Sequence, residues 1–574
     1  MEKKTINIIT GLVFLGCLSR LYYYVWEFAP DFPCWDEWSL LHLFLNDKEG
    51  ALSIWKLMEP HQGHILFFPK LVFLCLYNVF GWSPRLECFL IVTLIGLGGL
   101  LLISIYQKSI QYTKFALSHF MLWPCLLIIF SLNQGENLLW GFQVAWAMVL
   151  VFSLATLWFL QKLSYTNQTS KSWLLFMYAC IFAVLASGSS AMGIMVWPAF
   201  LPVLLFMPKS HHKSRMIIIW IIFSVIFFVI IYMLKTGISQ GVTPSAYGYI
   251  NFFTSLLGSY FVISAPLNEQ PTILFIAQIT GCLMILCFVI NAIIVILARE
   301  RLMKTKCIPW ISLGLFAAGF VLMVTISRSP ISSNQWLYTR YSTFSQFFWI
   351  SILACSGVLM SNGFSNRINL FKRIEMQFGV AIILMCVFYS RSARSIEFGL
   401  DWSYVAQMNR AIFMNVSSIP DNSKVNDIAW YTGIKVKDYR QLYESAQKIN
   451  VLDTGRIEMK MGVMRENFKI IMIEQPAAKG SFVTKGDFEI IGKLPASAKR
   501  GEYPVVFISP DGAKQFISAT VAYIEPEGDV KSTVKCFTMP LSREYLNQFG
   551  RKFKIWVYYH HDNSIYELAD TLEI

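Results

Sequence analysis

Two adjacent carboxylates, Asp36 and Glu37, lie between two tryptophans in the stretch Cys34-Trp35-Asp36-Glu37-Trp38, which follows a long apolar segment. Carboxylates among aromatic rings lose hydration, and a bound partner is needed to offset that cost. A partly desolvated carboxylate can also accept a proton from a hydroxyl group, as a general base does. We therefore expect chemistry at this pair; a solvated acidic turn with interfacial tryptophan anchors is the alternative.

His61 and His64 follow in the same loop. Three residues apart, they could share one face of a turn and bind a metal together with Asp36 or Glu37. No further ligand spacing supports a metal site, so we favour a role of the histidines beside a substrate phosphate. Hydrogen bonding to a lipid headgroup or a loop carbonyl is the alternative. Lys70, the first basic residue beyond them, joins the candidate phosphate ligands.

A second polar stretch, residues 133–143, separates two apolar segments and carries Glu136, Asn137, Trp140 and Gln143. Amides and a carboxylate can bind the hydroxyls on the edge of a sugar ring, and a tryptophan can cover its C–H face. These four residues are therefore candidates for substrate binding. Ordinary capping of helix ends would explain them equally well.

Two arginines, Arg328 and Arg340, flank a loop that the charge pattern places outside the cell. Membrane proteins concentrate Lys and Arg on the cytoplasmic side, so basic residues outside are informative. A guanidinium group can donate two parallel hydrogen bonds to phosphate oxygens. We therefore assign Arg340, Arg328 and the neighbouring Tyr341 to phosphate binding. Snorkelling to lipid headgroups is the alternative, and it suffices for Arg391 and Arg394.

The elements that position these residues must be membrane-spanning. Of 574 residues, 55% are hydrophobic and 14% charged, against roughly 25% charged in soluble domains. A soluble protein of this length would need more polar surface, so most of the apolar sequence faces lipid. The net charge of +13 comes from short clusters between apolar runs. That distribution argues against nucleic-acid binding and fits the cytoplasmic charge bias.

About eleven apolar segments are long enough to cross roughly 30 Å of hydrocarbon. They lie near residues 5–26, 86–106, 115–132, 142–160, 173–189, 192–207, 216–234, 272–297, 308–326, 342–360 and 375–391. With a cytoplasmic N-terminus, every basic cluster between them is also cytoplasmic. This topology requires residues 39–57 and 65–82 to form two helices along the outer interface, and 250–266 to be a re-entrant or interfacial piece. If 65–82 and 250–266 cross instead, the loop at 134–143 lies inside.

The composition after residue 391 is that of a water-soluble domain, which an odd number of crossings places outside. Residues 401–450 look helical, and strand-like runs separated by turn signals follow from about residue 480. They predict a small antiparallel β-sandwich, making this domain α+β. The chain thus divides into a membrane domain at 1–391, with its first outer loop at 27–85, and an extracytoplasmic domain at 392–574.

This layout resembles the GT-C superfamily of glycosyltransferases, which use polyprenyl-phosphate sugars. The stretches Trp35 to Trp38, Glu59 to His64, Gln134 to Gln143 and Thr339 to Tyr341 look like bacterial members that modify O-antigen or other surface glycans. The likeness in layout covers residues 1 to about 391.

The resemblance implies inverting transfer of a hexose such as glucose from a polyprenyl-phosphate donor to a surface polysaccharide, on the outer face of the bacterial inner membrane. Asp36 would be the base on the acceptor hydroxyl, and Glu37 would orient the acceptor or share the proton. Arg340, with Arg328, would neutralise the leaving phosphate. No cofactor is implied, and a divalent metal stays open, with Glu136 the only candidate for a second acidic ligand. A lipid-linked sugar transporter or flippase and a surface-glycan polymerase or ligase are the alternatives.

Overall fold

The computed structural model describes residues 3–361 apart from 62, 112–118, 167, 209–211, 234–243, 262–269 and 332–337. Beyond these it describes residues 382, 385–386, 395–396, 398–399, 402–403, 406, 413, 441–446 and eight strands between 463 and 573. The contacts divide the chain into two units. Unit 1 comprises Met1–Ala29, Leu52–Leu76 and Pro84–Gly399, and unit 2 comprises Pro30–Ala51, Tyr77–Ser83 and Leu400–Ile574. The second unit thus takes in two pieces of the expected first outer loop.

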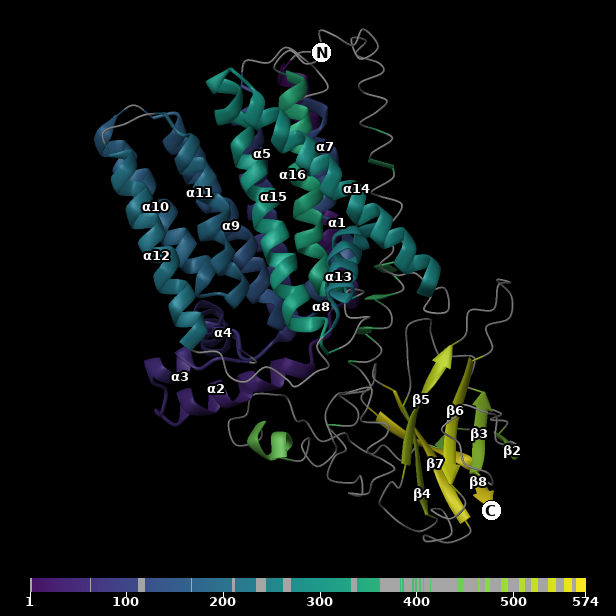
Figure 1. The fold of residues 1–574 in the computed structure, drawn as a ribbon. Helices are drawn as coiled ribbons and strands as arrows, with labels where there is room; N and C mark the ends of the chain where they lie inside the picture. The colour runs from purple at the N-terminus through teal and green to yellow at the C-terminus, as the bar shows by residue number, and fades with distance from the viewer. Residues whose placement is uncertain are drawn as a thin grey trace. The chain divides into compact units, whose positions relative to one another are not determined.

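Long apolar helices make up most of unit 1. Among the described residues, eight helices are long and apolar enough to cross a membrane, so the chain is a polytopic α-helical membrane protein. They are α1 (Lys3–Phe28), α5 (Pro84–Ser109), α9 (Val144–Ser164), α10 (Thr169–Ser187), α12 (Lys213–Met233), α14 (Gln270–Leu297), α15 (Arg301–Arg328) and α16 (Ser342–Ser361). A helix satisfies every backbone polar group within itself, which lipid demands. Helices α9, α10, α15 and α16 belong to one bundle (Figure 1).

Three of the eleven expected crossings are not among these eight helices. One, at 115–132, contains α7 (Leu122–Ile129), and its first residues, 115–118, lie outside the described residues. Another is formed by the 3-10 turn η4 (Ala191–Met195) and α11 (Val196–Phe206), an apolar helix shorter than the eight. The third, at 375–391, lies mostly outside the described part of the chain. The number eleven therefore stays a prediction.

Three short helices follow α1: α2 (Ser39–Lys48), α3 (Ile54–Met58) and α4 (Phe67–Phe80). The expected single helix over 39–57 is broken, because Gly50 adopts a φ of 65°, a left-handed conformation that glycine tolerates. The Ser53 hydroxyl then accepts the Lys56 N–H at 3.4 Å and caps α3. Helix α4 has 14 residues, and at about 1.5 Å per residue it is shorter than the hydrocarbon layer.

The helices of unit 1 pack through small residues and through buried tryptophans. Helix α13 (Ala246–Gly258), which covers part of the expected re-entrant or interfacial piece, packs on α14 so closely that a Cβ at Gly281 would collide with the Thr254 carbonyl oxygen. Glycine allows such backbone approach between membrane helices. The buried Trp310 indole donates to the Ser109 hydroxyl at 3.0 Å, and Trp197 donates likewise to Ser187 at 2.9 Å. The core therefore satisfies these indole N–H groups internally.

Unit 2 contains the strands. They are β1 (Val463–Met464), β2 (Ile470–Glu474), β3 (Asp487–Lys493), β4 (Val505–Pro510), β5 (Ser518–Ile524), β6 (Lys535–Ser542), β7 (Lys552–Tyr559) and β8 (Ser564–Glu573). They pair in the order β1-β8-β7-β4-β5-β6-β3-β2, antiparallel except for β1 with β8. The buried Trp556 indole of β7 donates to the Ser509 hydroxyl of β4 at 2.9 Å. Of the helix expected over 401–450, the described residues are helical at 402–403, 406, 413 and 441–446.

Candidate functional site

The candidate residues fall into both units. Asp36 and Glu37 belong to unit 2. The remaining candidates belong to unit 1: His61, His64, Lys70, Glu136, Asn137, Trp140, Gln143, Arg328, Arg340 and Tyr341. Within unit 1, five of them come together from two segments about 200 residues apart in the sequence: Glu136, Asn137, Trp140, Arg340 and Tyr341.

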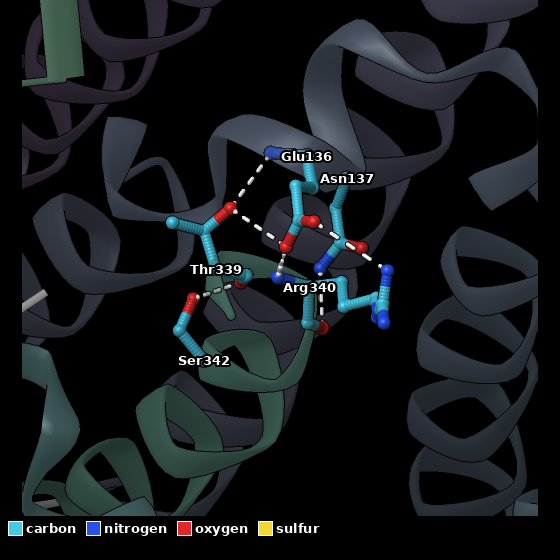
Figure 2. Close-up of polar contacts among 5 residues, drawn as sticks. All are labelled: Glu136, Asn137, Thr339, Arg340 and Ser342. Atoms are coloured by element: carbon cyan, nitrogen blue, oxygen red, sulfur yellow. Dashed lines mark hydrogen bonds and ion pairs between the residues drawn. The ribbon is translucent and has the colours of Figure 1, made fainter. Parts of the chain in front are cut away.

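The Glu136 carboxylate is held by the backbone and the hydroxyl of the segment that carries Arg340. Glu136 lies in the short helix α8 (Gly135–Leu139), and Arg340 lies in the 3-10 turn η8 (Thr339–Tyr341) that leads into α16. The Arg340 backbone N–H donates to Glu136 Oε2 at 2.8 Å, and the Thr339 hydroxyl donates to the same oxygen at 3.2 Å. The Glu136 N–H in turn donates to Thr339 Oγ1 at 2.9 Å (Figure 2). These reciprocal bonds fix α8 against η8.

The guanidinium of Arg340 is surrounded by aromatic rings. Its central carbon lies 4.6 Å from the ring centre of Tyr338, 5.2 Å from Tyr341 and 5.9 Å from Trp140. Rings at such distances attract a cation. Its contact with Glu136 is a single long one, 3.5 Å from Nη1 to Oε1, although a guanidinium has five N–H donors and pairs best with a carboxylate through two parallel bonds. Most of these donors therefore lack a carboxylate partner within the described residues.

Two amide side chains of the 133–143 stretch leave an acceptor unused, and one of them, Asn137, contacts the arginine segment. Asn137 Nδ2 donates to the Arg340 carbonyl at 2.8 Å and to the Thr343 hydroxyl at 2.7 Å. Its Oδ1 atom is buried without a hydrogen-bond partner among the described residues, as is the Oε1 atom of Gln143. Buried acceptors are almost always satisfied in folded proteins. A ligand that brings hydroxyl or amide donors would supply the missing partners.

Other polar groups of the 133–143 stretch serve the fold. The chain here runs through two 3-10 turns, η2 (Leu132–Gln134) and η3 (Gly141–Gln143), on either side of α8. Buried backbone carbonyls freed by such breaks need other hydrogen-bond donors. Gln134 Nε2 donates to the Ile129 carbonyl at 3.0 Å, and Asn133 Nδ2 donates to the Tyr260 carbonyl at 2.9 Å. The helix-end capping considered from the sequence thus applies to these two side chains.

The two histidines form a tight hairpin. The N–H of each donates to the carbonyl of the other, at 2.9 and 2.8 Å, and Gly63 between them has a φ of 81°. The His64 ring lies 3.5 Å from the Ser190 hydroxyl, measured from Nδ1 to Oγ. The His61 ring lies edge-on against Phe142, with 5.1 Å between ring centres.

That contact links the hairpin to the arginine cluster. Phe142 stacks on Trp140 with 5.9 Å between ring centres, and Trp140 is one of the rings around Arg340. A continuous aromatic row therefore runs from His61 to the guanidinium of Arg340.

The two further basic candidates are placed differently. Lys70 Nζ donates to the carbonyls of Lys56 and Glu59 at 3.1 and 2.8 Å, so its ammonium group caps the end of α3. Burial lowers the pKa of Lys70, and the Glu59 carboxylate partly offsets that effect. Arg328 is the last residue of α15, where a positive charge stabilises the helix C-terminus. The loop between Arg328 and Tyr338, residues 332–337, lies outside the described residues.

In unit 2 the acidic pair divides into a buried and a partly exposed carboxylate. Glu37 is 1% exposed, and its Oε2 atom accepts the Cys34 N–H at 2.6 Å, which caps the 3-10 turn η1 (Trp35–Trp38). Asp36 is partly exposed. Trp35 has a φ of 46°, a costly conformation for a bulky residue that often marks functional sites. Its ring packs edge-on against Trp402 at 4.6 Å.

Reasoning from the sequence missed Tyr338 and Thr343, which complete the surroundings of Arg340. The signal was present, because five of the six residues from Tyr338 to Thr343 carry a hydroxyl group and the sixth is the arginine. Within the described residues, no group of three or more His, Cys, Asp or Glu side chains could hold a metal ion. No family model, curated protein or solved structure matches the chain. The geometry of the two clusters therefore carries the functional argument.

Proposed function

We propose that this chain is a GT-C-like inverting glycosyltransferase that moves a hexose from a polyprenyl-phosphate donor to a surface glycan such as O-antigen. The observation that carries the proposal is the guanidinium of Arg340, ringed by Tyr338, Tyr341 and Trp140 with most of its donors unengaged by a carboxylate. A group of this kind binds a phosphate oxygen pair and stabilises the charge that develops on a leaving phosphate.

The surroundings of Arg340 favour a phosphate that carries a sugar. The acceptor oxygen of Asn137, next to the Arg340 segment, and that of Gln143 lack a partner within the described residues, and hydroxyl donors would satisfy them. The Trp140 ring, which stacks on Phe142, gives the guanidinium an apolar neighbour, and aromatic side chains of this kind commonly line sugar sites. A simple phospholipid headgroup would satisfy the arginine but would bring fewer hydroxyl groups to the two amides.

The proposed base, Asp36, is supported by features of unit 2 alone. Its neighbour Glu37 is buried and bonded to the Cys34 N–H, so Glu37 organises the turn, while the partly exposed Asp36 is the carboxylate that an acceptor hydroxyl can approach. The strained Trp35 immediately before Asp36 is the kind of backbone outlier that persists where function requires it. We therefore assign proton acceptance to Asp36 and its positioning to Glu37.

The test is a transfer assay with the full chain in lipid nanodiscs. Labelled polyprenyl-phosphate hexoses are offered with a purified O-antigen acceptor, and label in the glycan is measured. Arg340→Lys keeps the charge but cannot donate two parallel hydrogen bonds. We expect its KM for donor to rise tenfold or more, which corresponds to a loss of about 1.4 kcal/mol in binding free energy per factor of ten.

Arg85→Lys is the matched control, because Arg85 also stacks on a tryptophan, Trp26, with 5.6 Å between the guanidinium carbon and the ring centre. That variant should transfer normally. Equal, near-wild-type kinetics in both variants would contradict the role of Arg340. Movement of the lipid-linked sugar across the bilayer without any transfer would instead identify a transporter.

A further inference from the structure

Glu136 is anchored independently of the arginine side chain that it neutralises. Its Oε2 atom receives the Arg340 backbone N–H and the Thr339 hydroxyl, while only Oε1 reaches the guanidinium, at 3.5 Å. The long single contact is weak beside a bidentate pair. The guanidinium can therefore turn to another anion while the carboxylate stays where the backbone holds it.

A nearby negative charge is needed when no ligand is bound. The Arg340 side chain is 22% exposed, and burial of an unpaired charge is costly. Within the described residues Glu136 is the carboxylate that contacts it. The same fixed charge necessarily opposes any phosphate that binds Arg340, because the two anions would then lie beside each other.

The proposed reaction changes the charge of the ligand at this position. The donor is a phosphodiester with one negative charge. Transfer breaks the bond between the anomeric carbon and the phosphate oxygen and forms a bond from that carbon to the acceptor oxygen, whose proton passes to the base. The phosphate leaves as a monoester, which carries nearly two charges at neutral pH because its second pKa is about 6. The product would thus bind Arg340 more tightly than the donor does.

We propose that Glu136 is a positioning residue that competes with phosphate for Arg340 and so drives release of the polyprenyl-phosphate product. The inference rests on the proposed function. It differs from the substrate-binding role expected for Glu136 from the sequence. If Glu136 bound the sugar, removing its carboxylate would weaken binding of the ligand. A competing anion predicts a gain.

The experiment compares Glu136→Gln with the wild-type chain in nanodiscs, with polyprenyl phosphate and its hexosyl diester as the two probes. The amide retains an oxygen for the Arg340 N–H and the Thr339 hydroxyl but loses the charge. We expect the affinity for polyprenyl phosphate to rise about tenfold and that for the diester to rise less. The kcat should fall without a rise in the KM for donor. Glu136→Asp keeps the charge, so its kcat should be closer to that of the wild-type chain than the kcat of Glu136→Gln is. A purely structural role would change kcat and KM together.

Glu300→Gln, an exposed carboxylate before α15, is the control and should change neither affinity. Should Glu136→Gln fail to fold, Glu136→Ser removes the same charge and leaves room for water. If the wild-type chain binds neither probe, the proposed function itself fails. If it binds both and the variant binds polyprenyl phosphate equally or more weakly, the competition is refuted while the function stands.

Discussion

Replacing Thr339 by valine tests the joint between α8 and η8 with almost no change of volume. The Thr339 hydroxyl accepts the Glu136 N–H at 2.9 Å and donates to Glu136 Oε2 at 3.2 Å. Both residues are buried, at 8% and 7% exposed. Valine fills the same space but leaves the N–H without an acceptor and the carboxylate with one donor fewer.

The expected cost follows from these two bonds. A buried N–H left without a partner costs about 1–3 kcal/mol. A hydrogen bond between helices in a membrane contributes roughly 0.6 kcal/mol on average and at most about 1.7. We therefore expect Thr339→Val to lower the free energy of unfolding by about 2–3 kcal/mol. The carboxylate also loses part of its anchor, so donor use should decline with stability.

The measurement is the free energy of unfolding in bilayers, for example by steric trapping, together with the KM for donor. Thr339→Ser is the control, because it keeps both hydrogen bonds and loses only a methyl group, which we expect to cost under about 1 kcal/mol. If valine and serine lower the stability equally, the hydroxyl contributes nothing, and the reasoning about the α8–η8 joint is refuted.

Three further predictions concern other parts of the chain. Asp36→Asn should reduce transfer roughly a hundredfold or more while the protein folds normally, and near-normal turnover would refute the role of Asp36 as the base. Glu37→Gln should mainly lower stability, because Glu37 is buried and bonded to Cys34. Gly281→Leu should lower the temperature of thermal melting by forcing α13 and α14 apart, since its Cβ meets the Thr254 carbonyl oxygen. Gly16→Leu is the control and should leave that temperature unchanged, because a Cβ there meets nothing within 4 Å. Trp55→Cys should react with an impermeant thiol reagent from outside the cell and Gln168→Cys should not, both positions being exposed; the reverse pattern would overturn the topology drawn from the basic clusters.

The long helices were predictable because lipid allows few ways to satisfy a backbone. Any apolar run of about 20 residues must become a helix there, and the runs at 86–106 and 272–297 became α5 and α14. The break at Gly50 was missed, since a single glycine within an amphipathic pattern signals a turn only weakly. Strands β3 to β8 of unit 2 lie beyond residue 480, where composition and turn residues predicted strands, whereas β1 and β2 precede that point and were missed.

The roles of individual polar side chains were much less predictable. The sequence drew attention to the 133–143 stretch, but it could not show that Asn133 and Gln134 serve backbone carbonyls while Asn137 and Gln143 keep an open acceptor. That division depends on partners such as Thr343, 206 residues from Asn137 in the sequence. The two carbonyl partners of Lys70 could not be foreseen either, and its binding of phosphate stays a prediction.

The joint between α8 and η8 has a consequence for how the protein is made. Thr339 emerges from the ribosome 203 residues after Glu136, which at about 5–20 residues per second is a delay of roughly 10–40 s. During that interval α8 and its carboxylate have entered the membrane assembly without their final partners. Helices α9 to α15 must therefore insert around a stretch that is still unpaired. A nascent chain that stalls before η8 would lack the partners of Glu136 and Asn137. Membrane quality-control proteases would meet those polar groups exposed in an incomplete chain.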